Sequence, residues 1–284
     1  SYTCPSCGAE LVCGTETAAT NCPYCGNPTV LGGKLSGKLK PEYIIPFKLD
    51  KKAAIQQLTH YYKGKVLLPK AFRSQNHIEE IQGVYVPFWL YDAHAEVRGE
   101  YDGEVTESHR EGDYIVTTTQ YYDILRRGST EFVKVPVDGS SKMPNAHMDA
   151  IEPFDYREAV PFSTAYLPGF LADRYDEDES TCYARAKSRM EQSTAAALRD
   201  TVTGYSEVHP RVENIHLQPG KAHYALLPVW MLHTKWKGKD FLFAMNGQTG
   251  RLIGDLPIDK GRLAAWFFGI SLPLMAVLSF LLLW

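Results

Sequence analysis

The stretches CPSCG at residues 4–8 and CPYCG at residues 22–26 each hold two cysteines separated by two residues, and fourteen residues lie between the two pairs. In such a turn, proline fixes the approach, glycine allows the positive φ that follows, and both thiolates face one side of a tight loop. Two turns of this kind supply the tetrahedral set of sulfur ligands that zinc prefers, so the sequence predicts a zinc ribbon with a structural Zn²⁺ ion. The predicted ligands are Cys4, Cys7, Cys22 and Cys25.

Two other assignments of these cysteines fit the pattern less well. A catalytic zinc keeps an open position and usually has histidine or carboxylate among its ligands, whereas four thiolates close the coordination sphere. Two disulfides would suit an oxidising compartment, but a cytosolic chain keeps its thiols reduced. We therefore favour structural zinc. Cys13 could be a spare ligand or a redox thiol, but for Cys13 and Cys182 alike we favour an ordinary free cysteine.

The other end of the chain, residues 263–284, contains no charged residue and is rich in leucine. About twenty helical residues cover the roughly 30 Å hydrocarbon core of a bilayer, and Trp266 and Trp284 lie near the two ends, where interfacial tryptophans are common. Pro273 would kink such a helix without abolishing it. The alternative, a buried helix of a soluble domain, would usually show a polar face. The sequence predicts a transmembrane helix over residues 263–284.

The charges beside this segment predict its orientation. Lys260 and Arg262 immediately precede the apolar run, and no charge follows it before the sequence stops. Positive charge is retained on the cytoplasmic side, so we expect the preceding residues in the cytoplasm, where thiols also stay reduced. Because the sequence does not begin with methionine, we expect it to be a piece of a longer chain.

Between these ends the sequence predicts a mixed antiparallel α+β body. Glycine and lysine mark a linker after the ribbon, and proline and aromatic residues without a clear period mark an ordered connection in the middle. The predicted domains are the ribbon 1–33, the linker 34–41, a first α+β half 42–136, the connection 137–175, a second α+β half 176–259 and the membrane helix 263–284.

Periodicity and capping residues predict the elements of each half. The first half is expected to hold a strand at 42–47, a helix at 51–62 capped by Asp50, a strand at 84–98, and strands at 113–127 and 130–137 paired across Gly128 and Ser129. The second half is expected to hold a helix at 176–199, strands at 204–208, 212–217, 223–234 and 239–245, and a tight turn at Lys237 and Gly238.

Two short segments echo one another. VYVPFWLYD at residues 84–92 and ALLPVWMLH at residues 225–233 share a proline, an apolar residue, a tryptophan and two further hydrophobic residues in register. Each follows a predicted helix and leads into a predicted hairpin. A chance match stays open, but the echo favours a body built from two related halves, with Trp89 and Trp230 in equivalent places.

Composition and motifs narrow the function. The net charge is −3, and residues 1–33 contain no lysine or arginine, so the ribbon lacks the basic face that nucleic-acid binding requires. No GxSxG, HExxH or phosphate-binding loop is present, and no catalytic residue is predicted. The acidic cluster at residues 176–179 could bind calcium, but it lacks the loop pattern of such sites and suits the N-terminus of a helix.

Longer strings resemble a known family. CPYCGNPTV, HIEEIQGVYVPFWL, VPVDGSSKM, FSTAYLPGFLADRYD and FAMNGQTGRLIGDLPIDKG are similar to a widespread bacterial family of TFIIB-type zinc-ribbon membrane proteins, sometimes labelled primosomal helicases. No nucleotide-binding loop supports that label here. A member of this family is encoded in a phage-shock-type envelope-stress operon beside a phage-shock A homologue and an SPFH-domain protein. The resemblance implies the bacterial inner membrane and a scaffold that binds such partners.

The resulting hypothesis is a non-enzymatic, membrane-anchored cytoplasmic adaptor. Its expected contact surfaces are the ribbon tip at Pro23 and Tyr24 and the aromatic connection from Phe154 to Phe170, although ordinary domain packing would explain the latter equally well. Two hypotheses of other classes stay open: a membrane-tethered ribbon that binds nucleic acid or polymerase, and an enzyme whose site is a pocket of convergent polar groups with perturbed titration.

Overall fold

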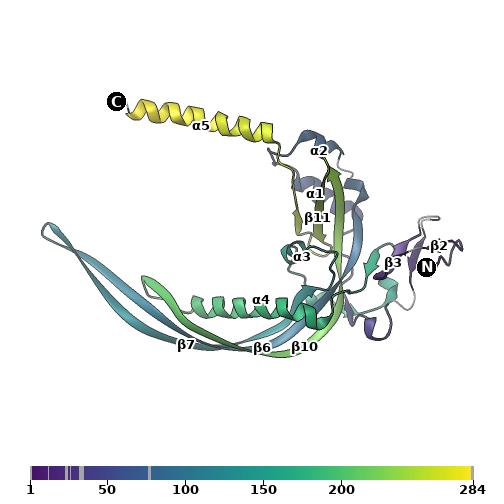
Figure 1. Ribbon diagram of the computed structural model, residues 1–284, viewed down its shortest axis with the longest axis horizontal. Coiled ribbons are helices and arrows are strands. Elements are labelled where there is room, and N and C mark those ends of the chain that lie inside the picture. Colours follow the sequence, from purple (N-terminus) through teal and green to yellow (C-terminus); the bar gives the residue numbers. More distant parts are fainter. Residues whose placement is uncertain are drawn as a thin grey trace.

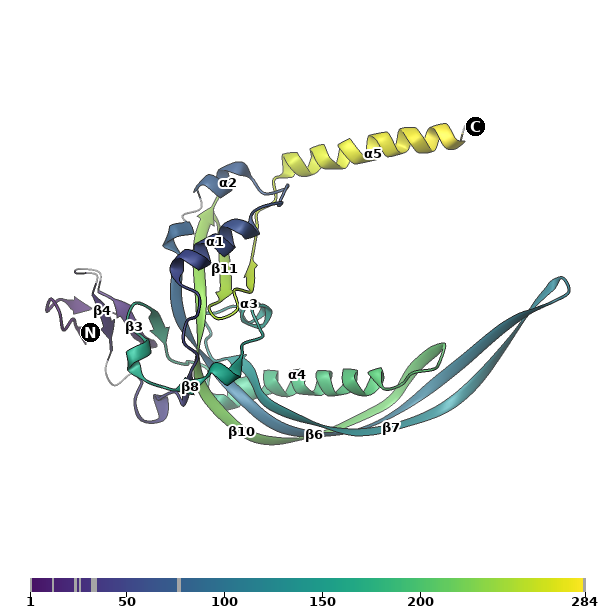
Figure 2. The same cartoon turned by 180° about the vertical axis from the view of Figure 1, so that it is seen from behind.

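The structure, a computed structural model, describes residues 2–11, 13–22, 25, 27–31, 35–75 and 78–282. It has an α+β body with three projections (Figures 1 and 2): a small N-terminal module, a long curved arm of β-strands, and the C-terminal helix α5. The arm and α5 leave the body toward the same side, whereas the N-terminal module lies on the opposite side. The predicted fold class, a mixed α+β body between a cysteine module and an apolar helix, is confirmed.

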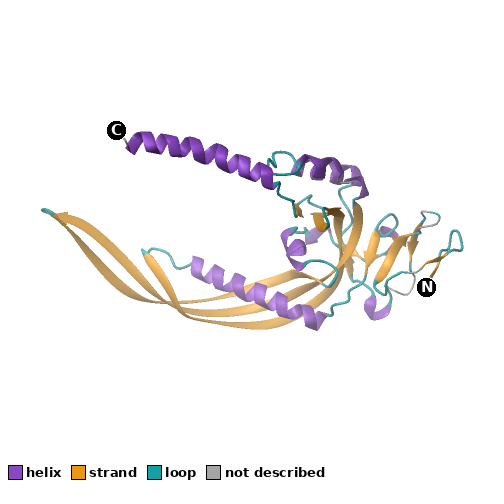
Figure 3. Cartoon of the chain, turned by 45° about the horizontal axis from the view of Figure 1, so that its top comes forward, coloured by secondary structure: helices purple, strands orange, loops and turns teal. Residues whose placement is uncertain are grey.

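The described helices are α1 (Lys51–Tyr61), α2 (Lys70–Gln75), α3 (Asn145–Ala150), α4 (Glu179–Asp200) and α5 (Lys260–Leu282), with short 3₁₀ turns at Gly37–Leu39, Ile78–Glu80, Tyr156–Glu158 and Thr164–Tyr166. The strands are β1 (Tyr2–Thr3), β2 (Glu10–Leu11), β3 (Thr17–Asn21), β4 (Pro28–Val30), β5 (Tyr43–Ile44), β6 (Gln82–Glu111), β7 (Tyr114–Asp138), β8 (Val160–Pro161), β9 (Leu171–Asp173), β10 (Glu207–Trp236), β11 (Lys239–Asn246) and β12 (Leu252–Gly254). Figure 3 shows that strands dominate the body and the arm.

The arm consists of three antiparallel strands, with β6 in the centre between β7 and β10. The predicted hairpin between residues 113–127 and 130–137 is wrong: β7 is one strand of 25 residues, and Gly128 and Ser129 pair with Val97 and Glu96 of β6. The chain turns instead after β6, where Gly112 has a φ of 61°. Glycine and serine suggested a turn, but the strand on either side continues in register, and the ladder overrides the local preference.

The strand predicted at 239–245 and the turn at Lys237 and Gly238 are confirmed by β11, but other predicted strand ends are wrong. Residues 84–98 are part of the 30-residue β6, and the three strands predicted within 204–234 form the single strand β10. Pro210 and Pro219 lie at two register shifts in the pairing of β10 with β6. Proline cannot donate to a ladder, but a bulge accommodates it without ending the strand.

Helix α4 covers the concave face of the arm (Figure 1). Alternate residues of β6 face it, and Val97 and Tyr101 pack there against Leu198. Gly99 lies on the same face, and a Cβ added to it would come within 2.8 Å of the Leu198 side chain. The period of two along the strand therefore gives the arm one apolar side, which is buried by the helix.

The end of α4 is clamped to the arm by an ion pair. Arg199 donates from Nε to Oε1 of Glu213 on β10 at 2.6 Å, and the Tyr101 hydroxyl donates to the same oxygen at 2.9 Å. The bond from Arg199 lowers the pKa of Glu213 below its ordinary value. A carboxyl with a lowered pKa contributes stability above its unfolded pKa, and that contribution is lost as the pH falls through the folded pKa.

We therefore expect Glu213→Gln to loosen the clamp at pH 7 but to change little at an acidic pH below the lowered pKa of Glu213, where the wild-type carboxyl is also protonated. Arg199 is half exposed, so solvent screens the pair and the expected loss is small. Hydrogen exchange of the last turn of α4 measures it. Glu191→Gln, in the exposed pair with Lys187 on the same helix, is the control and should leave that turn unchanged. Equal effects of Glu213→Gln at both pH values would contradict the ionic clamp.

Both long predicted helices are present. The sequence predicts the first over 51–62, and α1 covers Lys51–Tyr61, with the Asp50 carboxylate accepting from the Ala53 amide at 2.7 Å. The second begins three residues later than predicted, because Asp178 is its cap and accepts from the Thr181 amide at 2.8 Å. The neighbouring Asp176 accepts from Ser141. These bonds account for two members of the acidic cluster, as expected for a helix N-terminus.

The two echoed segments make matching bonds. The indole Nε1 of Trp89 donates to the carbonyl of Glu177 at 3.0 Å, and Nε1 of Trp230 donates to the carbonyl of Leu49 at 3.0 Å. Each of these carbonyls belongs to the residue directly before the aspartate that caps a helix, α4 in one case and α1 in the other. The helix from each half of the sequence therefore docks on the hairpin of the other half.

Backbone bonds around this point match as well. The Gly139 amide donates to the Pro87 carbonyl at 2.9 Å, and the Gly247 amide donates to the Pro228 carbonyl at 2.8 Å. Strands β9 and β5 pair in parallel with β6 and β10, at residues 84–85 and 225–226 respectively, which are equivalent positions of the echo. These correspondences support two related units that interlock through β6 and β10.

If the two sites are equivalent, Trp89→Phe and Trp230→Phe should lower stability by similar amounts. We expect the free energy of unfolding to fall by about 1–2 kcal/mol in each variant. Each variant lacks the indole N–H donor, so the carbonyl before the helix cap loses its hydrogen bond. Denaturant unfolding in detergent, followed by circular dichroism, measures the two losses. Trp266→Phe, on the exposed surface of α5, is the matched control and should have no effect on the body. A loss confined to one of the two variants would argue against equivalence.

Candidate metal centre

The structure brings all four predicted ligands together. The Sγ atoms of Cys4, Cys7, Cys22 and Cys25 lie within 4.8 Å of one another. Across the two knuckles, the Sγ atoms are 3.9 Å apart for Cys4 and Cys25 and 3.8 Å apart for Cys7 and Cys22. A tetrahedron with metal–sulfur bonds of about 2.3 Å has edges of about 3.8 Å. The donor set therefore fits one tetrahedral, thiophilic metal ion.

Local backbone geometry explains why the first knuckle forms. The Cys4 amide donates to the Ala9 carbonyl at 2.8 Å, and the Gly8 amide donates to the Cys4 carbonyl at 2.9 Å, which closes the loop between β1 and β2. Gly8 has a φ of 74°, the conformation that the CPxCG pattern predicts for its glycine. Cys4 and Cys22 are buried beside Leu11.

Cys4 and Cys7 of the first knuckle have pKa values shifted in opposite directions. Backbone amides of Cys7 and Ser6 donate to the Cys4 sulfur and lower the pKa of Cys4 to about 6. The Ala9 amide likewise lowers the pKa of Cys7, but burial and the thiols of Cys25, Cys4 and Cys22 outweigh it and raise that pKa to about 12. Deprotonation of Cys4 is therefore favoured, whereas deprotonation of Cys7 is disfavoured by burial and by the neighbouring thiols. A bound cation removes this opposition, because it neutralises the charges that repel one another.

The remaining cysteines lie apart from the cluster. None of the six cysteines forms a disulfide in the structure. Cys13 packs partly buried against the module but is not one of the four clustered ligands. Cys182 is buried in α4, and its Sγ lies 3.5 Å from the Asp138 carbonyl oxygen, as a core cysteine would. Burial raises the pKa of this thiol to about 11.

The second knuckle is joined to the body. Strand β3, which leads into Cys22, pairs with β9 at Thr17 and Ala19, so the sheet of the body continues into β3 and β4. The Arg174 amide donates to the Glu16 carbonyl at 2.8 Å, and Lys142 forms an ion pair with Glu16 at 3.1 Å. The cysteine module is thus held by a strand pairing as well as by its chain connection.

The predicted membrane segment is helical and uncovered. Within α5, residues Lys260–Ser279 are long and apolar enough to cross a membrane, and none of the most apolar part is buried. Leu272 and Met275 are 60% and 63% exposed. The alternative of a buried core helix is therefore wrong. Of the predicted anchor residues, Trp266 is exposed on α5, and Trp284 lies outside the described residues.

Of the two predicted contact surfaces, the structure describes the aromatic connection but not the ribbon tip. Pro23 and Tyr24 lie outside the described residues. In the aromatic connection, Phe154 is only 4% exposed and packs edge-on against Phe88, while Phe170 stacks on Phe47 with ring centroids 4.1 Å apart. The phenylalanines at both ends of this connection are therefore packed into the body, as the alternative proposed.

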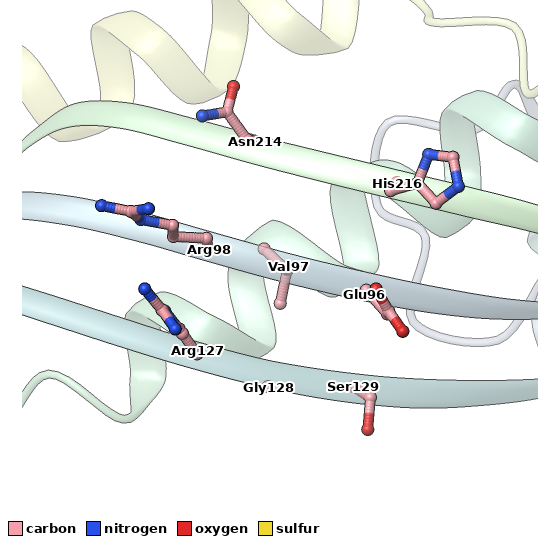
Figure 4. A pocket seen from close by; sticks show the side chains of 8 residues that line it. All are labelled: Glu96, Val97, Arg98, Arg127, Gly128, Ser129, Asn214 and His216. Carbon is pink, nitrogen blue, oxygen red and sulfur yellow. The ribbon is translucent and has the colours of Figure 1, made fainter.

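One hollow on the arm brings polar groups together. Figure 4 shows side chains from β6, β7 and β10 around an open hollow of about 520 Å³. Arg98 pairs across the strands with Arg127 and Asn214, and Glu96 in the same way with Ser129 and His216. The hollow is shallow, and it offers charge on the surface of a sheet without the enclosure typical of enzyme sites.

An N-terminal four-cysteine cluster, an α+β body and a C-terminal apolar helix define the class of this protein. The chain is 38% identical, over an alignment of 320 residues, to a protein of Bacillus subtilis (strain 168) named "Uncharacterized protein YdjG". The alignment covers 95% of this chain and 94% of that protein, so the chain belongs to the YdjG family. No family model matches the chain. No solved structure matches it either.

Proposed function

We propose that this chain is a membrane-anchored adaptor on the cytoplasmic side of the bacterial inner membrane, where it binds other proteins. In this proposal Zn²⁺ is the structural metal of the cysteine module, and α5 crosses the bilayer. The observation that carries the proposal is the arm, a long projection of strands that extends far beyond the body (Figure 2). The family resemblance to zinc-ribbon membrane proteins supports the same class.

The distal part of the arm has exposed apolar side chains and free strand edges that a partner protein could bind. Strand β10 ends its pairing with β6 at Glu104, so the distal part of the arm is a two-stranded ribbon of β6 and β7. Along this ribbon, Tyr114 and Ile115 beside the turn and Tyr121 at its base are 78%, 77% and 75% exposed. A two-stranded ribbon is marginal in water, and its free edges can accept another strand. A partner that covers these side chains would stabilise the ribbon.

The charges of the arm favour a position outside the bilayer. Arg98, Glu100 and Arg211 are exposed along it, and charged side chains are costly in hydrocarbon. Because α5 and the arm leave the body toward the same side, crossing a bilayer requires the body to turn relative to α5. Lys260 and Arg262 then mark the cytoplasmic end of the helix.

The partners proposed from the family resemblance are SPFH-domain and phage-shock A-like proteins. A photo-crosslinking residue at Tyr121 tests this in intact bacteria, and the same residue at Lys187, on the exposed surface of α4, is the matched control. Crosslinks from Tyr121 alone to an SPFH-domain or phage-shock A-like protein would support the proposal. The absence of any protein crosslink at the arm would overturn an adaptor role for it, and crosslinks to RNA polymerase would favour the competing hypothesis.

A further inference from the structure

The body is hollowed where the chain enters α5. Two adjoining hollows of about 740 Å³ and 300 Å³ share Leu256, Pro257 and Ile258 in their walls. The larger continues to the turn between β10 and β11, and the smaller is completed by residues 64–68. We call the two together the entry groove. Its walls expose apolar side chains, since Ile258 is 60% exposed.

Lysines surround this groove. Lys65, Lys237, Lys239 and Lys260 are among its lining residues. The three segments that form it, residues 60–70, 235–241 and 255–263, carry eight lysine and arginine residues and three aspartates. The whole chain, by contrast, has a net charge of −3, so positive charge is concentrated at this place. An apolar floor within a ring of cations is complementary to a lipid with an anionic head group.

Two of the acidic groups are already engaged. Asp259 accepts from the Gly261 amide at 3.0 Å and lies 3.8 Å from the Arg262 guanidinium. Asp240 lies 3.6 Å from the His233 ring and 3.9 Å from Lys235. Neither carboxylate is paired in the structure with Lys237 or Lys239. Those ammonium groups can therefore meet phosphate without first breaking an ion pair of the structure.

Aromatic rings lie beside the lysines. The Lys237 ammonium lies 5.7 Å from the Trp236 ring centroid, and the Lys65 ammonium lies 4.9 Å from that of Tyr61. Trp236 packs edge-on against the buried Phe72, which fixes it at the rim of the body. Tryptophan and lysine in this combination are typical of the membrane interface, where the ring lies at head-group depth and the ammonium reaches phosphate.

The position of the groove relative to α5 follows from the chain itself. Ile258 is two residues and Leu256 four residues before Lys260, where the helix begins. Four residues span at most about 14 Å, so the groove lies close to the start of α5 at any angle between helix and body. In the structure the two are also bonded, since Arg262 donates to the carbonyls of Val66 and Leu68 at 3.2 and 2.9 Å.

We propose that the entry groove binds anionic phospholipid of the leaflet from which α5 enters the bilayer, and so seats the body on the membrane surface. This inference rests on the proposed crossing of the bilayer by α5. Charge complementarity and continuity with the apolar helix both favour a phospholipid as the occupant. Lys65, Lys237, Lys239 and Lys260 contact the phosphate groups, and the apolar floor meets the upper part of the acyl chains.

The test compares the full chain in vesicles of phosphatidylcholine alone with vesicles that contain 30% phosphatidylglycerol. We expect hydrogen exchange of residues 63–68 and 235–241 to be at least fivefold slower in the anionic vesicles. The double variant Lys237→Glu and Lys239→Glu should lose this protection. The matched control, Lys187→Glu with Lys221→Glu on other faces, should keep it. Equal exchange in both vesicles, or loss of protection in the control alone, would overturn the proposal.

Two further arms identify the source of the phosphate and the cause of a failure. Inorganic phosphate added to the phosphatidylcholine sample should give no protection, and protection by phosphate equal to that by the anionic lipid would overturn a lipid site. Extraction with alkaline carbonate checks the anchor separately. A chain that is extracted contradicts the proposed crossing by α5, whereas a chain that stays inserted without lipid-dependent protection contradicts the groove alone.

Discussion

Replacing Cys22 by serine should remove the metal from the protein and unfold the cysteine module. Wild-type protein is expected to contain one zinc per chain, and the variant close to none, because three thiolates cannot close the tetrahedron around the ion. A structural zinc site contributes about 10–16 kcal/mol to the module that it holds, far more than so small a module can gain from its own core. Elemental analysis of the purified protein measures the metal, and hydrogen exchange of residues 2–11 measures the order of the first knuckle.

The chain provides its own controls for this experiment. Cys13→Ser changes a thiol that packs beside the cluster but is not a member of it, and Cys182→Ser changes one in α4. Both variants should keep one zinc. A chelator strong enough to remove zinc should reproduce the loss of protection seen in Cys22→Ser and leave α4 protected. Iron in place of zinc, or a folded module without metal, would contradict the proposal of structural zinc.

Two lysines in the middle of α5 should release the protein from the membrane. A lysine at the centre of a membrane helix costs about 2.5–3.5 kcal/mol, so Leu272→Lys combined with Val277→Lys costs about 5–7 kcal/mol. We expect wild-type chain to resist alkaline carbonate and the double variant to be extracted. Both side chains are more than half exposed in the structure, so the body and its metal content should not change.

Leu272→Ala with Val277→Ala is the matched control, since it alters the same positions without adding charge. It should remain inserted. Extraction of the alanine variant together with the lysine variant would point to a general loss of folding, which metal content would reveal. Retention of the lysine variant in the membrane would show that α5 does not cross the bilayer as a single apolar span.

The strands of the arm show where local signals mislead. Gly128, Ser129, Pro210 and Pro219 have a usual role in turns and strand ends, and the predicted strands stop at or near them. Each lies inside a continuous ladder instead. A usable signal was present around Gly112, where charged and turn-forming residues separate two segments of alternating pattern. The free energy of pairing over about twenty positions outweighs the unfavourable strand propensity of one residue. A short window of sequence does not contain that total pairing energy.

The exchange of helices between the halves was equally invisible in the sequence. The echo around Trp89 and Trp230 suggested equivalent places, and the matching bonds agree. Nothing local indicated that each tryptophan meets the helix of the other half, because the contacts join residues 88 and 181 positions apart. The entry groove likewise depends on three segments that are distant in the sequence. Only the charges next to α5, Lys260 and Arg262, carry a local signal, because they flank the apolar run.

By itself, the sequence determined the features that depend on neighbours along the chain: the four-cysteine ligand set, the capped helices α1 and α4, and the apolar helix α5. Spacing within a turn, a side chain that bonds to an amide three residues ahead, and a continuous apolar run are all local quantities. Only the tertiary structure decided that β6, β7 and β10 join into one arm, that the two halves exchange helices, and that lysines gather where α5 begins. These depend on pairings between distant segments, whose free energy is shared across the whole fold.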